Sequence, residues 1–307
     1  MAHFPIRIGT LRPGHSVFFD VFILISEKYV HYLRSSDPFD ADRLEKLKSK
    51  GVKKLYIRAE EEKNYLSYME AGLDSLKSAK MSKVQKGVIA RDSMVTEAEN
   101  LERNLDSQEG YEKAQNRVSK VLEYLMSDKG AAKSILTNAG VSTDAYQHSA
   151  NVASLSLGLA PRVGIFDPDE LFDLAMAALI HDLGKVKLGI PFGLEKEKLP
   201  RNLITKYYSH PSVSVDMVAD KKYVTARTLR LIADHEEIGD GDGFPEHKKL
   251  IKLPPCSQVL NLCNDYERYS SIQKIPPLEL FRTYIGERGH FFMEEHLLKL
   301  GAMLAGK

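Results

Sequence analysis

The 307-residue sequence has few cysteines, almost no excess charge and no long hydrophobic run. Its two cysteines, Cys256 and Cys263, do not form a Cys-x-x-Cys metal motif, so we expect buried, reduced thiols in a cytoplasmic protein. The formal net charge of +1 provides no electrostatic basis for binding duplex DNA, duplex RNA or an anionic membrane. The most apolar stretch, residues 17–25, has about half of the roughly 18 residues that a membrane helix needs, and it contains Asp20. The N-terminus also lacks the layout of a signal peptide, so we expect neither export nor a membrane span.

The composition is ordinary for a globular protein, with 43% hydrophobic and 28% charged residues. Short runs rich in β-branched and aromatic residues alternate with helical patterns in the first part of the chain. Strands are expected at 16–25, 28–33 and 52–59, and helices at 39–51 and 60–79. We therefore predict a small α/β domain over residues 1–90. It contains no catalytic cluster, which favours a regulatory or sensory role.

Residues 91–130 are polar, with apolar positions recurring at helical spacing. The apolar stripe is interrupted near Gly110, which indicates two helices or one bent helix. We interpret this segment as connecting helices. The repeat is short, so a packing face is favoured over a coiled-coil dimer.

From residue 131 to 307 the pattern is almost entirely helical. In FDPDELFDLAMAALI, Asp167 is a candidate N-cap, with Pro168 at the first helical position and Glu170 three residues after the cap. The predicted fold class is therefore mostly α. It combines a C-terminal all-helical bundle with a smaller N-terminal α/β module.

The helical part contains the candidate functional residues. Four histidines lie in segments of helical pattern or at their ends: His148, His181, His210 and His235. Three of these segments hold a carboxylate nearby: Asp144, Asp182 and Asp234. Imidazole and carboxylate together are typical ligands of zinc, iron or manganese. A lone histidine on an apolar face is more often a core residue, but four such segments in one domain favour a metal site.

Spacing indicates what kind of metal site this could be. Asp144 and His148 are four residues apart and would share a helix face. His181 and Asp182 are adjacent, so they point about 100° apart on a helix. They converge only near a helix end, or if the carboxylate bridges two ions. This favours a two-metal cluster over one four-coordinate zinc; the alternative is that His181 and Asp182 form a hydrogen-bonded helix cap.

Residues 181–185, HDLGK, resemble the His-Asp-x-Gly-Lys signature of the HD superfamily of metal-dependent phosphohydrolases. Further segments follow in the order of one branch, the HD-GYP domains, which hydrolyse cyclic di-GMP: QHSANVASLSLGLA, LAMAALIHDLGKVKLGIP, YYSHPSVS, DHEEIGDGDGFP and SQVLNLCNDYERYSS. The resemblance implies a phosphodiesterase for cyclic di-GMP or a related cyclic dinucleotide. It also implies two divalent ions, iron or alternatively manganese, and attack by a metal-bridged hydroxide.

The resemblance implies six metal ligands, one of which differs from the family's residue: His148, His181, Asp182, His210, Asp234 and His235. Asp234 stands where the family has the first of two histidines. The family's late aspartate aligns with Asn264, and Asp265 follows. Asn264 fits the register, whereas Asp265 is chemically the better ligand, so both stay candidates. Asp144 lies where some members place a third-metal ligand.

The remaining implied site residues contact the substrate. Lys185 would stabilise the charge that develops on the scissile phosphate, with Asp182 as the other catalytic residue. The GYP signature is present as Gly243-Phe244-Pro245, so Phe244 keeps a ring that can stack on a base but lacks the hydroxyl. The GDGDG run before it is one residue longer than usual.

The family's basic stretch after residue 271 is also altered. Only Lys274 and Arg282 are present there, and neither aligns with the family's basic positions. Two hypotheses therefore stand. The first is a phosphodiesterase acting on a cyclic dinucleotide or another phosphoester. The second is a degenerate HD-GYP signalling module that binds metal and a nucleotide, a second copy or a partner protein without hydrolysing cyclic di-GMP.

Overall fold

The computed structural model describes residues 2–52 and 54–307, and the chain divides into two units, Met1–Met81 and Ser82–Lys307. The predicted fold class is confirmed. The second unit is all-helical among its described elements, and the first holds a small four-stranded sheet with helices. The division between the units falls before the predicted boundary at residue 90.

The first unit is an antiparallel sheet in the order β1-β4-β2-β3, with two α-helices. Its elements are β1 (His3–Arg7), β2 (Val21–Ile25), β3 (Lys28–Leu33), α1 (Ala41–Ser49), β4 (Lys54–Arg58) and α2 (Glu62–Asp74). Each predicted strand and helix is found within its expected range, although Lys53 in the strand predicted at 52–59 lies outside the described residues. β1 was not predicted. It contains Pro5, which an edge strand tolerates because one side of it makes no ladder hydrogen bonds.

Along the strands, buried side chains alternate with more exposed ones, and the buried ones form the core of this unit. Leu55 and Ile57 on β4 are fully buried, and the Phe19 ring packs edge-on against Tyr65 and Tyr68 of α2. These residues bury one face of the sheet against the helices. The unit therefore has its own hydrophobic core, as the predicted small domain requires.

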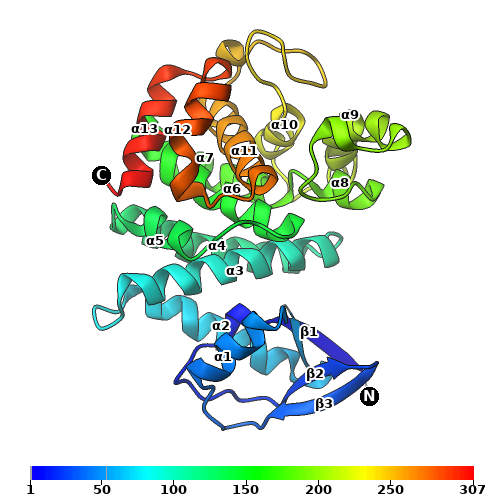
Figure 1. Ribbon diagram of the computed structural model, residues 1–307, viewed down its shortest axis with the longest axis vertical. Coiled ribbons are helices and arrows are strands. Elements are labelled where there is room, and N and C mark those ends of the chain that lie inside the picture. The colour runs from blue at the N-terminus through cyan, green and yellow to red at the C-terminus, as the bar shows by residue number, and fades with distance from the viewer. Residues whose placement is uncertain (1, 53) are drawn as a thin grey trace. The chain divides into compact units, whose positions relative to one another are not determined.

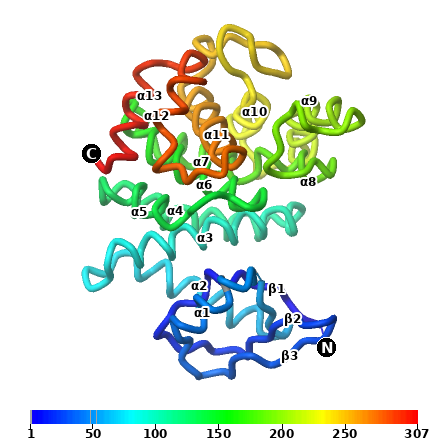
Figure 2. The backbone as a smooth tube through the Cα atoms, in the orientation of Figure 1, coloured from blue at the N-terminus to red at the C-terminus, as the bar shows by residue number. Residues whose placement is uncertain are grey.

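The second unit is a bundle of helices. They are α3 (Lys83–Arg103), α4 (Gln108–Ser127), α5 (Ala131–Thr137), α6 (Ala145–Leu159), α7 (Pro168–Ile180), α8 (Leu183–Leu188), α9 (Arg201–Asp216), α10 (Ala226–Asp234), α11 (Pro255–Gln273), α12 (Pro277–Arg288) and α13 (Glu294–Ala305). Figure 2 traces the chain through them in order. The segment predicted as connecting helices forms α3 and α4, which pack against α5, α6 and α7 within this unit. The break between them lies just before the first turn of α4, which contains Gly110.

α6 and α7 lie at the middle of the bundle, with α3, α10 and α11 packed against α7 (Figure 1). α7 begins as predicted, because the Asp167 side chain accepts a hydrogen bond from the Glu170 main-chain N–H and Pro168 occupies the first turn. The residues from Leu174 to Ile180 are all buried. The central helix therefore delivers its C-terminal end, where HDLGK starts, to the interior of the bundle.

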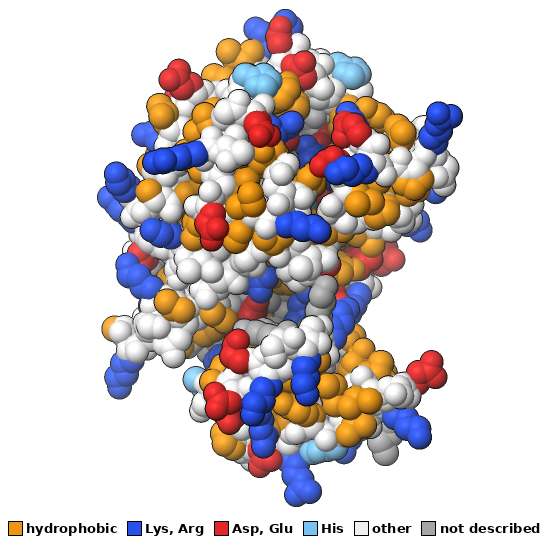
Figure 3. Space-filling model, in the orientation of Figure 1, with side chains coloured by type: hydrophobic (Ala, Val, Ile, Leu, Met, Phe, Trp, Pro, Cys, Tyr) orange, Lys and Arg blue, Asp and Glu red, His pale blue; other side chains and the backbone are white. Residues whose placement is uncertain are grey.

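Two further sequence predictions concern exposure and surface. Cys256 and Cys263 are buried and free, as expected. Among the described residues, no helix combines the length and apolar character needed to cross a bilayer. On the face seen in Figure 3, acidic and basic side chains are interspersed, in keeping with the near-zero net charge.

Candidate metal centre

The HDLGK segment forms the junction between two helices. His181 caps the C-terminus of α7, and Asp182 is the N-cap residue of α8. Both are buried, with exposed fractions of 0% and 4%. The next glycine, Gly184, allows α8 to lie against α9, because a Cβ there would clash with the main-chain oxygen of His210. The sequence thus brings a histidine and an aspartate into the interior at a point where the helix direction changes.

The four candidate histidines are all buried, and each is oriented through Nδ1. Three of these nitrogens lie within hydrogen-bond distance of the carbonyl oxygen three residues earlier: His181 to Ala178, His210 to Tyr207 and His235 to Ile232. The fourth, Nδ1 of His148, contacts the buried carboxylate of Glu267. A carbonyl oxygen or a carboxylate only accepts, so Nδ1 carries the proton and Nε2 presents a lone pair. Burial lowers the pKa of His210 to about 4 and that of His181 well below its usual value, which keeps both rings neutral.

These Nε2 atoms converge in two pairs. Nε2 of His148 lies 3.2 Å from Nε2 of His181, and Nε2 of His210 lies 2.9 Å from Nε2 of His235. Lone pairs that face each other at this distance repel unless a cation lies between them. The arrangement therefore fits metal ions, which neutral imidazole binds through Nε2.

Asp182 lies between the two histidine pairs. Its Oδ2 is 3.6 Å from Nε2 of both His148 and His181, and its Oδ1 is 3.4 Å from Nε2 of both His210 and His235. Oδ1 is buried and has no hydrogen-bond partner among the described residues. Although burial opposes charging, the nearby ammonium of Lys185 holds the pKa of this carboxyl well below its usual value. A charged carboxylate with one oxygen toward each histidine pair is placed to bridge two ions.

Glu236 was not among the ligands predicted from the sequence. Two groups of side chains have ligand atoms close enough to share an ion: His148, His181 and Asp182 in the first group, and Asp182, His210, His235 and Glu236 in the second. Oε1 of Glu236 lies 3.6 Å from Nε2 of His210 and 3.8 Å from that of His235. The sequence did contain a signal for Glu236: the GDGDG run is one residue too long when Asp234 and His235 are aligned with the family's two histidines. If His235 and Glu236, rather than Asp234 and His235, occupy the double-histidine positions, that extra residue disappears.

Asp234, expected as a ligand, lies in neither group. Its Oδ1 accepts a hydrogen bond from Nζ of Lys248 at 2.8 Å, and its Oδ2 faces the Ser257 hydroxyl. Neighbouring residues on a helix point about 100° apart, so the orientation that turns His235 inward turns Asp234 toward Lys248. This placement replaces Asp234 by Glu236 in the candidate ligand set.

Asn264, not Asp265, faces the cluster. Oδ1 of Asn264 lies 3.1 Å from Nε2 of His148, and its amide donates to the His235 carbonyl, which fixes the orientation of the oxygen. The Asp265 carboxylate is bound by three other side chains: Arg268, Arg288 and Tyr284. Of the two alternatives, the structure brings only Asn264 to the first group.

Asp144 takes a different role from the expected one. It is the N-cap of α6, where its side chain accepts from the Gln147 main-chain N–H and from the Gln147 amide. Its backbone is extended and the helix begins only after it, so the i, i+4 spacing of a regular helix does not apply to Asp144 and His148. It belongs to neither group of potential ligands.

Lys185 lies at the edge of the cluster. Its Nζ is 3.0 Å from Oδ2 of Asp182 and 3.2 Å from Oε1 of Glu236. Burial favours the neutral amine, but these two carboxylates outweigh it and raise the pKa of Lys185, so the side chain stays charged. A fixed ammonium beside the predicted ligands is suited to an anionic group.

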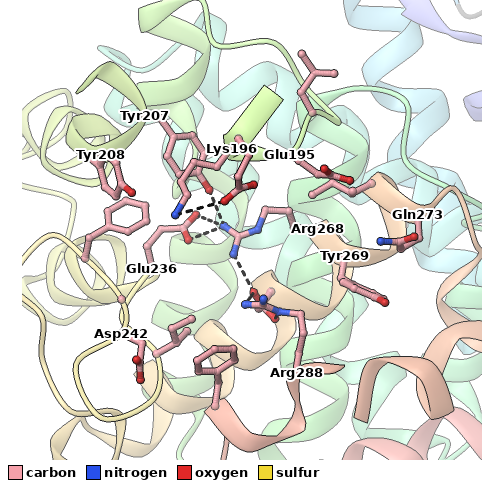
Figure 4. A pocket seen from close by; sticks show the side chains of 18 of the residues that line it. Glu195, Lys196, Tyr207, Tyr208, Glu236, Asp242, Arg268, Tyr269, Gln273 and Arg288 are labelled. Atoms are coloured by element: carbon pink, nitrogen blue, oxygen red, sulfur yellow. Dashed lines mark hydrogen bonds and ion pairs between the residues drawn. The ribbon is translucent and has the colours of Figure 1, made fainter. Parts of the chain in front are cut away.

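A cavity of about 580 Å³ lies beside the cluster, with Glu236 and Arg268 in its wall. In Figure 4 the Arg268 side chain reaches between Glu236 and Arg288. Arg288 also lines the cavity, whereas Lys274 and Arg282, the basic residues noted in the sequence, do not. The two arginines of this wall thus come from α11, six residues before Lys274, and from the last residue of α12.

Aromatic rings form another part of the wall. The Phe244 ring packs edge-on against Tyr208 and contacts Tyr207 and His210, and it is only 8% exposed. Gly243 is required before it, because a Cβ there would clash with the Glu236 main-chain oxygen. A smaller cavity of about 40 Å³ is lined by His148, Asp182 and Lys185 among others. The GFP segment therefore shapes the larger cavity, and the ligand cluster borders the smaller one.

The chain is similar to known proteins. The HD domain family model matches residues 136–275. The chain is 26% identical over 126 residues to the cyclic di-GMP phosphodiesterase PA4108 of Pseudomonas aeruginosa, which is 41% of this chain but only 30% of that protein. It also resembles the solved structure of Bd1817, an HDG"Y"P protein from Bdellovibrio bacteriovorus, with a TM-score of 0.84 and 24% identity over 99% of this chain and 100% of that one. At that identity, the likeness to Bd1817 shows a shared fold.

Residues 136–275 match the HD domain family, and the chain shares the fold of an HDG"Y"P protein. The matched residues 136–275 contain both ligand groups, Lys185 and Arg268. The likeness to Bd1817 extends over both units, whereas the chain spans about a third of the length of the curated relative. The HD domain thus holds clusters of histidine and carboxylate suited to divalent metal ions.

Proposed function

We propose that the HD domain is a metal-dependent phosphodiesterase that hydrolyses cyclic di-GMP or a related cyclic dinucleotide. The observation that supports it most is the convergence of two histidine pairs, lone pair to lone pair, on the two oxygens of Asp182. The name of the curated relative supports the substrate class.

In this proposal each group holds one divalent ion, iron or manganese. His148, His181 and Asn264 would hold the first, and His210, His235 and Glu236 the second, with Asp182 shared by both. Bound ions of this kind lower the pKa of a water molecule and neutralise charge on a phosphate. The donor set of imidazole and oxygen suits iron or manganese and contains no thiolate.

Other residues of the domain would position the substrate. The ammonium of Lys185 lines the small cavity and would hold a non-bridging phosphate oxygen as negative charge develops on it. The rings of Tyr207, Tyr208, Phe244 and Tyr269 border the larger cavity and would stack on the bases. The cavity of about 580 Å³ falls within the usual range for small-ligand sites.

The experiment pairs two variants that test both the centre and the ligand assignment. Protein purified without chelator, or reconstituted anaerobically with iron or manganese, is analysed for bound metal and incubated with cyclic di-GMP, and the products are separated chromatographically. We expect about two ions per chain and a linear dinucleotide or GMP. Asp182→Asn should lose both ions and turnover, whereas Asp234→Asn, a matched change of a buried aspartate that binds Lys248, should keep its metals.

Each other outcome has a definite meaning. No bound metal after reconstitution would refute the centre. Two ions with cyclic di-GMP intact would keep the metal centre but refute this substrate, leaving another phosphoester or the degenerate signalling module. Loss of metal in Asp234→Asn, with Asp182→Asn still loaded, would overturn the ligand assignment.

A further inference from the structure

The second group differs from the first in the charges that contact its carboxylate ligand. Nη1 of Arg268 lies 2.5 Å from both Oε1 and Oε2 of Glu236, and Nζ of Lys185 lies 3.2 Å from Oε1. Two cations therefore share the carboxylate that would have to bind the second ion.

In the first group, a carboxylate and not a cation contacts one of the ligands. Nδ1 of His148 contacts the Glu267 carboxylate, which is fully buried. A carboxylate behind an imidazole increases its strength as a ligand. Asn264, which faces the same position, is neutral. Within the described residues, Arg268 bonds to Glu236, Asp265 and Tyr207 and makes no hydrogen bond or ion pair with His148, His181 or Asn264.

Arg268 cannot move away from Glu236 without losing other bonds. Its Nη2 donates to Asp265 at 2.8 Å, and its Nη1 also contacts the Tyr207 hydroxyl at 3.1 Å. Asp265 is fixed in turn by Arg288 and Tyr284. The guanidinium is therefore held in place beside the second group. A divalent ion that binds there meets a fixed positive charge in a site with little solvent screening.

We propose that Arg268 makes the two metal positions unequal, so that the first fills at low metal concentration and the second only at higher concentration. The inference rests on the proposed two-metal centre. Because hydrolysis needs both ions, the occupancy of the second position makes activity depend on the supply of divalent metal. Arg268 sets the concentration at which this happens.

The test is a metal titration that requires no turnover. Chelator-stripped protein is titrated with Mn²⁺ in a calorimeter, and bound manganese is measured independently after desalting. The wild-type protein should show two steps, the second at least about tenfold weaker, because a unit charge about 5 Å from a divalent ion costs more than about 1.4 kcal/mol even at the dielectric constant of water. Arg268→Gln removes the charge but keeps a hydrogen-bond donor, and it should tighten the second step by about tenfold or more while leaving the first unchanged.

Two controls separate charge from shape. Arg268→Lys keeps the charge and should titrate with a weak second step like the wild type. Arg288→Gln changes an arginine of the same cavity that binds Asp265 but not Glu236, and it should leave both steps unchanged. Thermal melting of the stripped proteins checks folding. If Arg268→Gln does not fold, Arg268→Met, which has a side chain of similar reach and no charge, takes its place.

A second step in Arg268→Gln that is no tighter than in the wild type would refute the proposal, because Arg268 would then only position Glu236. Two equal steps in the wild type would refute it as well. If no protein, including the wild type, binds Mn²⁺, the metal centre itself is wrong, and this result is distinct from the other two.

Discussion

Glu267 is the residue whose replacement tests most directly how the proposed first metal position is built. Its side chain is fully buried and receives contacts from four groups: Nδ1 of His148, the Ser142 hydroxyl, the Asn151 amide and the Ser271 hydroxyl. Glu267→Gln keeps the size and shape of the side chain. It replaces one acceptor oxygen by an NH₂ group, which would then face groups that are themselves donors.

The size of the effect follows from this mismatch. A buried donor without an acceptor costs about 1–3 kcal/mol, and about 1.4 kcal/mol corresponds to a tenfold change in affinity. We therefore expect Glu267→Gln to weaken the first metal by about 10- to 100-fold, the usual range when the partner of a ligand histidine is lost. The second metal should be little affected, because His210 and His235 are oriented by main-chain carbonyls.

The assay is a competition titration of stripped protein with Mn²⁺ and a fluorescent chelator, together with thermal melting. Ser271→Ala is the matched control, because it removes only the long contacts of 3.3 and 3.5 Å to the same carboxylate. It should leave the affinity close to that of the wild type. If Glu267→Gln folds and binds both ions as tightly as the wild type, Glu267 does not orient His148 and the reasoning is refuted.

Three further predictions concern charge, packing and ionisation. Lys185→Met should keep its bound metal but lower kcat on a hydrolysed dinucleotide by about 10²- to 10³-fold, and an unchanged kcat would exclude contact with the reacting phosphate. Gly184→Ala places a Cβ against the main chain of α9 and should reduce the free energy of unfolding in urea by about 1–3 kcal/mol, whereas Gly286→Ala, where the space is open, should not. Burial raises the pKa of the Cys256 thiol to about 11 and that of Cys263 to about 12. Both should resist a thiol reagent at pH 8 until the chain unfolds. An unfolded thiol ionises near pH 9.0, so the stability that the two buried thiols contribute is complete below that pH and is lost as the pH rises through 9 toward their folded pKa values. Rapid labelling of the folded protein at pH 8 would contradict the prediction.

Local sequence alone was sufficient for most of the secondary structure. The Asp167 cap, the proline after it and the apolar run to Ile180 specify α7 without help from the rest of the chain, since capping and helical periodicity are short-range effects. The strands of the first unit were found for the same reason. β1 was missed, because Pro5 reads as a strand breaker until the partner strand shows that it lies at an edge.

The candidate site was only partly accessible to the same reasoning. The sequence located the segments that carry His148, His181, His210 and His235, and the junction after α7 that buries His181 beside Asp182. These residues can be recognised locally, because a histidine or an aspartate within a helical pattern or at its end differs from the apolar residues around it.

Tertiary structure decided which of two neighbouring residues faces the interior. Between Asp234 and Glu236, and between Asn264 and Asp265, the choice depends on how α10 and α11 are rotated in the bundle, and one residue changes that direction by about 100°. Nor did the sequence predict a role for Arg268, which contacts Glu236 although the two residues are 32 positions apart in the chain. Sequence therefore determined the helices and the kinds of ligand, whereas packing determined which atoms converge, because the direction of a side chain depends on contacts between segments that are distant in the chain.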